Sequence, residues 1–100
     1  MKSLIDIRFT LQYDQFNTMG AGYILPLINC HPMLSLLQIT IVCPKLDENG
    51  VFQGMRYFES FNAICMAVKT GKPGIDFHLS EMHEWDEYFY QVQLTITFSS

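Results

Sequence analysis

The chain has 100 residues, of which 49% are hydrophobic and 16% charged, and its formal net charge is −4. This length fits one domain with a single core, and the composition excludes a disordered chain. The negative balance argues against a nucleic-acid groove built from Lys and Arg, and no apolar run approaches the length of a membrane span. We therefore expect one soluble domain over residues 1–100 that binds neither nucleic acid nor membrane.

Two segments at opposite ends of the chain, residues 4–13 and 88–98, alternate strictly between apolar and polar side chains. A period of two is typical of a strand with one buried face and one face in water. In the last strand the apolar positions are Tyr90, Val92, Leu94, Ile96 and Phe98. The similar character of the two segments suggests that they pair side by side.

Residues 15–44 contain no Asp, Glu, Lys or Arg. Two glycines and two prolines disfavour a long helix here, and Met19-Gly20-Ala21-Gly22 is typical of a flexible turn. Residues 23–25 are then expected in an edge strand or an ordered loop. Alternation returns over residues 36–43 and predicts a strand that Pro44 ends.

The second half of the chain predicts a hairpin followed by a helix. Asn49-Gly50 favours a tight turn with a return strand over residues 51–58. Ser60 is a candidate N-cap, Gly71 a candidate C-terminal cap, and the stripe between them suits a helix lying on a sheet: Phe61, Ile64, Cys65 and Val68. A short strand is expected over residues 75–79.

These segments predict an α+β fold, with a small antiparallel sheet of four to six strands and one helix, about residues 60–70, packed on one face. A split, ferredoxin-like arrangement stays open, but it requires a helix within residues 15–34.

Ionisable side chains concentrate after the strand at residues 75–79, where His78, Glu81 and His83 are candidate zinc ligands. Their spacing matches no metal motif, and the favoured interpretation is a solvated acidic turn between two strands. Cys30 and His31 are adjacent, but neighbours in an extended chain point in opposite directions. We expect no catalytic residues and no cofactor.

The segment from Pro73 to Ser100 holds five acidic residues and no Lys or Arg, and its aromatic residues are interleaved with the acids. Trp and Tyr are enriched at binding hot spots, and acidic charge steers a protein towards a basic surface. The partner-binding candidates are Glu81, Glu84, Trp85, Asp86, Glu87 and Tyr88. The alternative is that Trp85 closes the end of the sheet while the acids only keep the protein in solution.

The uncharged stretch over residues 15–44 also suggests an interface, because so many residues cannot all be interior in one small domain. Exposed apolar patches often mark such contacts, and a homodimer is the commonest way to cover one. The candidate dimer-interface residues are Phe16, Met19, Tyr23, Leu25, Met33 and Leu34.

Three cysteines in apolar contexts and an amino terminus without a signal-peptide pattern predict a cytosolic protein. The leading hypothesis is a non-enzymatic module that binds a basic site on a target protein, such as an inhibitor or immunity-type antagonist. The alternatives are a small-ligand or metal-dependent protein that uses His78, Glu81 and His83, and a structural homodimer or assembly subunit.

Overall fold

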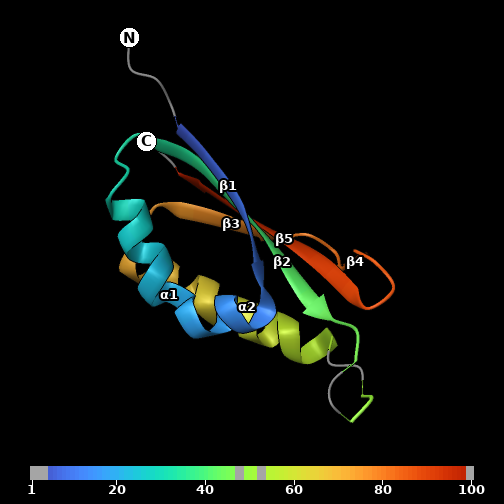
Figure 1. Ribbon diagram of the computed structural model, residues 1–100. Coiled ribbons are helices and arrows are strands. Elements are labelled where there is room, and N and C mark those ends of the chain that lie inside the picture. Colours follow the sequence, from blue (N-terminus) through green and yellow to red (C-terminus); the bar gives the residue numbers. More distant parts are fainter. Residues whose placement is uncertain (1–4, 47–48, 52–53, 99–100) are drawn as a thin grey trace.

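The computed structural model describes residues 5–46, 49–51 and 54–98, which form a sheet with two helices on one of its faces (Figure 1). The elements in chain order are β1 (Ile5–Gln12), α1 (Tyr13–Asn29), β2 (Leu34–Pro44), α2 (Gly54–Gly71), β3 (Ile75–Leu79), β4 (His83–Glu84) and β5 (Phe89–Phe98). The predicted α+β class is confirmed, and the described residues form a sheet of five strands, within the expected four to six. They form two helices instead of the one that was predicted.

The strands lie in the order β1-β2-β5-β3, and the short β4 continues along β5 beyond β3. β1 and β2 are parallel while the other pairs are antiparallel, so the sheet is mixed. The expected pairing of the first strand with the last is wrong, because α1 returns the chain to the start of the sheet and places β2 between them. No strand separates β1 from β2, so the split, ferredoxin-like alternative is also wrong.

Helix α1 occupies the stretch in which the sequence predicted a turn and an extended segment. Its buried residues recur every fourth position, at Phe16, Gly20, Ile24 and Ile28, and form one stripe against the rest of the core. Gly20 interrupts the helix with φ 50° and ψ −146°, so the turn expected around it exists as a kink. Packing of the stripe outweighs the poor helix propensity of the glycines and of Pro26.

Helix α2 confirms the predicted helix but begins six residues before Ser60, at Gly54. Tyr57 extends the buried stripe of Phe61, Cys65 and Val68 by one turn. The Tyr57 hydroxyl donates to the carbonyl oxygen of Pro44 at 2.8 Å, which joins the start of α2 to the end of β2. Ser60 lies inside the helix, where its hydroxyl is 3.1 Å from that of Tyr13.

The predicted return strand over residues 51–58 is wrong, because the chain is helical from Gly54 onwards. Gly50 takes the positive φ that the hairpin required, at 76°. Asp47 and Glu48 of that hairpin, and Phe52 and Gln53 of the strand, lie outside the described residues. Residues from Gly54 onwards form a helix because Tyr57 is buried on the same helical face as Phe61 and Cys65, and they do not pair with a strand.

The core lies between the helices and the sheet, and β5 and β2 cross its centre. Val92, Leu94 and Ile96 are at most 1% exposed, which confirms the register predicted for the last strand. Their partners on β2 are Ile41, Ile39 and Leu37, each with no exposed surface. The uncharged composition of residues 15–44 follows, because β2 is the central strand and α1 covers it.

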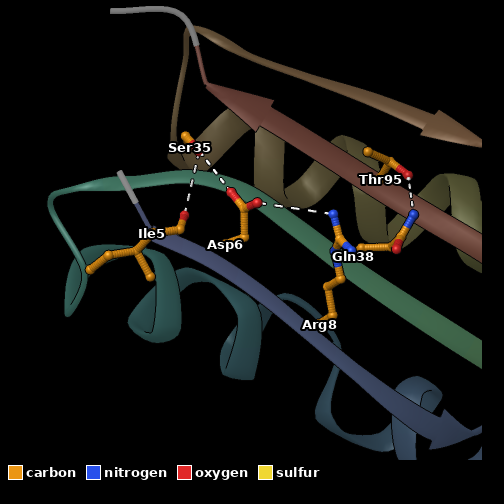
Figure 2. A network of polar contacts seen from close by, with 6 residues as sticks. All are labelled: Ile5, Asp6, Arg8, Ser35, Gln38 and Thr95. Carbon is orange, nitrogen blue, oxygen red and sulfur yellow. Dashed lines mark hydrogen bonds and ion pairs between the residues drawn. The ribbon is translucent and has the colours of Figure 1, made fainter. Parts of the chain in front are cut away.

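The second face of the sheet carries mainly polar side chains, with Leu36 and Val42 as apolar residues of β2 on the same face. One row across it contains Arg8 on β1, Gln38 on β2, Thr95 on β5 and His78 on β3. The amide of Gln38 donates to the Thr95 hydroxyl at 3.4 Å, and the guanidinium of Arg8 lies 3.9 Å from the carboxylate of Asp6; Figure 2 shows these residues on the sheet.

Candidate functional site

The segment of residues 81–90, named here the acidic–aromatic turn, runs through β4 and a tight turn into β5. The backbone N–H groups of Trp85 and Asp86 donate to the carbonyl oxygen of Phe89, at 3.0 and 3.2 Å. Oδ1 of Asp86 accepts from the N–H groups of Tyr88 and Phe89, at 2.7 and 3.0 Å. Four hydrogen bonds therefore close this turn, and the Asp86 side chain accepts two of them from the turn's own backbone.

The side chains of the acidic–aromatic turn face outwards. Trp85 is 49% exposed and Tyr88 is 68% exposed, and the carboxylates of Glu81, Glu84, Asp86 and Glu87 are all exposed. Trp85 is not sealed inside the end of the sheet. Two large aromatic side chains and four carboxylates are thus exposed on this one segment.

A groove of about 640 Å³ lies between this turn and the end of β2. Its walls are Pro44, Lys45, Leu46, Glu87, Tyr88, Phe89 and Tyr90. The backbone N–H of Lys45 donates to the carbonyl oxygen of Tyr88 at 3.0 Å, so the two walls are joined directly. A side chain of another molecule fits a space of this size, whose lining residues include two tyrosines and one glutamate.

Lys45 is the basic residue of this groove. Its Nζ lies 2.7 Å from Oε1 of Glu84 and 5.0 Å from the centre of the Tyr90 ring. The hydrogen bond to Glu84 raises the pKa of Lys45 above its ordinary value, so the lysine is charged at neutral pH. The ring face of Tyr90 thus already carries a cation, a contact that aromatic rings favour.

Sequence reasoning identified the acids, Trp85 and Tyr88, but it missed the opposite wall: Pro44, Lys45 and Leu46. No local pattern marks these three residues. The missing information is the register of β2 and β5, in which Pro44 pairs with Phe89 and Cys43 with Tyr90. Pairing of the predicted strands 36–43 and 88–98 would have brought the two walls together.

The three candidate metal ligands are not arranged as a metal site. His78 on β3 pairs with Thr95 of β5, His83 on β4 pairs with Gln91 of β5, and Glu81 lies in the segment between β3 and β4. Among the described residues, no group of three or more His, Cys, Asp or Glu side chains is placed to hold a metal ion. The solvated turn is therefore the better description of this segment.

The six candidate dimer-interface residues do not form one exposed patch. Phe16 and Leu34 are 1% and 7% exposed and belong to the core of this chain. Leu25 and Met33 are half-buried, whereas Met19 and Tyr23 are 42% and 41% exposed on α1. Tyr23 lies edge-on against Phe9 of β1, with ring centres 6.3 Å apart.

No helix in the described ranges combines the length and the apolarity needed to cross a membrane. Cys43 and Cys65 are buried thiols and Cys30 is an exposed one. Comparison of the chain with protein-family models, with curated proteins and with solved structures found no match.

Proposed function

We propose that this chain is a cytosolic, non-enzymatic protein-binding module, such as an inhibitor or an immunity-type antagonist, and that its acidic–aromatic turn binds a basic site on a target protein. The observation that carries the proposal is the exposure of Trp85 and Tyr88 on a hydrogen-bonded turn beside a groove. The exposed thiol of Cys30 supports a reducing compartment.

Rigidity of the turn favours binding. Ordering a flexible loop costs about 0.5–1.5 kcal/mol for each immobilised side chain, and that cost is subtracted from the affinity. Because the Asp86 carboxylate already holds the N–H groups of Tyr88 and Phe89, the backbone beneath the aromatic side chains is ordered before a partner arrives. Trp and Tyr themselves lose little conformational freedom on binding.

The chemistry of the groove fits an arginine or lysine side chain of the target. Glu87 and Tyr88, an acidic and an aromatic residue, line the same wall. Lys45 lies over the Tyr90 ring and forms an ion pair with Glu84. We expect a cationic side chain of the target to make the same two kinds of contact, with an aromatic ring and with a carboxylate. Charged pairs of this kind mainly raise the association rate and fix the orientation of the partner.

The first experiment places a photo-crosslinking amino acid at position 88, and in a second sample at Met66, which is 56% exposed on α2. Both forms are irradiated in cells that naturally produce the chain, and the crosslinked protein is identified and purified. A target captured from position 88 but not from position 66 supports the proposal. Capture of the same protein from both positions, or only from position 66, overturns it.

The second experiment measures association of the purified target at two ionic strengths. Steering by the carboxylates predicts that the association rate falls as salt rises, and that Glu87→Gln weakens this dependence. An association rate independent of salt contradicts the electrostatic part of the proposal.

A further inference from the structure

Strand β1 forms one edge of the sheet, and among the described residues it pairs with β2 alone. Its eight residues, IDIRFTLQ, contain no Pro or Lys, which often prevent an edge strand from pairing with another strand. The strand does carry two charges, Asp6 and Arg8, but they are of opposite sign, and its one irregularity lies at its start, between Ile5 and Asp6. We propose that β1 pairs antiparallel with β1 of a second copy of this chain, forming a two-fold symmetric dimer with one continuous sheet. This proposal is independent of the function proposed for the acidic–aromatic turn.

In β1, the backbone N–H and C=O groups of every second residue point towards β2, and those of the residues between them point away from the sheet. The N–H of Ile5 donates to the carbonyl oxygen of Met33 at 3.0 Å, so the backbone groups of Ile5 point towards β2. The pairing of β1 with β2 is irregular between Ile5 and Asp6 but continuous from Asp6 to Gln12. The backbone direction alternates along this regular part, so Asp6, Arg8 and Thr10 share the outward direction of Gln12. The N–H of Gln12 is occupied, since it donates to Oε1 of Gln15 at 3.1 Å. Asp6 and Arg8 therefore offer hydrogen bonds to a new strand.

Charge selects the register of the pairing. If the two-fold axis passes beside Ile7, Asp6 lies opposite Arg8 of the second copy, and Arg8 lies opposite Asp6 of the second copy. Both are residues with outward backbone groups, so each pair exchanges two hydrogen bonds and brings opposite charges together. Moving the axis to Arg8 places two arginines opposite each other, which is unfavourable. Asp6 and Arg8 lie on the polar face, where they form a 3.9 Å pair within one chain (Figure 2).

The helix-covered face gains apolar contacts in the same register. Ile5, which is 38% exposed, lies opposite Phe9 of the second copy, in a pair without backbone hydrogen bonds, where side chains approach most closely. Tyr23 packs against Phe9 from α1. In this register Tyr23 therefore lies beside Ile5 of the second copy, which would cover part of one exposed member of the interface expected from the sequence.

The rest of the molecule is compatible with a closed dimer. The other edge strand, β3, has five residues and is followed by a break before the two-residue β4, so it offers a much shorter template. The acidic–aromatic turn lies at the Gln12 end of the sheet, beside the end of β2. In an antiparallel dimer the two turns lie at opposite ends, which limits repulsion between the acidic segments.

A charge-exchange experiment tests the interface, with sedimentation velocity of the full chain as the readout. Asp6→Arg and Arg8→Asp each replace two attractive pairs with two repulsive ones, so each is expected to raise the dimer dissociation constant about tenfold or more. The double variant Asp6→Arg/Arg8→Asp restores both pairs with the charges exchanged, and its dissociation constant is expected to return to that of the wild type. Asp76→Arg, on β3, changes the net charge as Asp6→Arg does and is expected to leave the dimer intact.

A monomer at submillimolar concentration for the wild-type chain overturns the proposal. A dimer that neither single variant weakens, or that the double variant does not restore, also overturns it. Far-UV circular dichroism of each variant confirms folding; because Asp6 and Arg8 are exposed, their substitution is expected to leave the spectrum unchanged.

Discussion

The kink in α1 depends on a backbone conformation that glycine adopts readily and alanine does not. Gly20 has φ 50° and ψ −146°, inside a helix. A Cβ atom built there would lie 3.8 Å from Cγ1 of Ile64, an ordinary contact, so substitution creates strain in the backbone and no clash. Such a conformation costs a non-glycine residue about 1–3 kcal/mol. Removing a glycine from the unfolded chain returns about 0.4–1 kcal/mol, so we expect Gly20→Ala to lower the free energy of unfolding by about 1–2 kcal/mol.

Gly22, two residues later, is the matched control. It lies in the helical part of α1, and a Cβ atom there would meet nothing within 4 Å. Gly22→Ala is therefore expected to raise the free energy of unfolding by about 0.5–1 kcal/mol, because alanine favours a helix interior. Urea denaturation followed by circular dichroism measures both variants. If Gly20→Ala is as stable as Gly22→Ala, α1 does not depend on the kink and the reasoning fails.

Two further predictions concern the thiols and the turn. Burial raises the pKa of Cys43 and of Cys65 to about 12, so in the native protein a thiol reagent at neutral pH should modify Cys30 alone, and all three only after unfolding. Because unfolded thiols lose their protons near pH 9.0, the free energy of unfolding should be unaffected by them below that pH and fall above it, by about 1.4 kcal/mol per pH unit for each thiol. Denaturation at pH values of about 8 and about 10 should show a smaller fall for Cys65→Ala than for the wild type, and equal falls would contradict this. Asp86→Ala removes the acceptor for two backbone N–H groups and should cost about 1–2 kcal/mol, with faster amide hydrogen exchange at Tyr88 and Phe89; unchanged exchange would mean that Asp86 does not order the turn.

The parts of the fold that could be predicted are those with a regular pattern of burial. The alternation over residues 88–98 predicted β5 correctly. This strand lies between β2 and β3, and all three strands have their apolar side chains on the same face of the sheet. The stripe from Phe61 to Val68 predicted α2 for the same reason. In each case one local period determines which side chains are buried.

Helix α1 escaped prediction because its stability depends on contacts far along the chain. The ring of Phe16 packs against that of Phe61 at 5.5 Å, and Gly20 lies under Ile64, so α2 supplies much of the surface that α1 covers. The spacing of four between Phe16, Gly20, Ile24 and Ile28 was the available signal. It was hidden by the glycines and prolines, which local propensity weighs heavily.

The acidic–aromatic turn could be predicted as a surface, but its groove could not. Composition alone places Trp85 and Tyr88 among acids, whereas the opposite wall comes from β2 and requires the strand pairing. The ion pair of Lys45 with Glu84 joins residues 39 positions apart and leaves no trace in local sequence.

The central claim is that the acidic–aromatic turn binds another protein through its exposed aromatic side chains. The most direct test is the dissociation constant of the target crosslinked at position 88, measured by calorimetry with the wild type, Trp85→Ala and Met66→Ala. Because Trp85 lies on the proposed interface and Met66 on α2, the claim predicts that Trp85→Ala weakens binding by about tenfold or more while Met66→Ala changes it less than about twofold. Equal dissociation constants for Trp85→Ala and the wild type would contradict the claim.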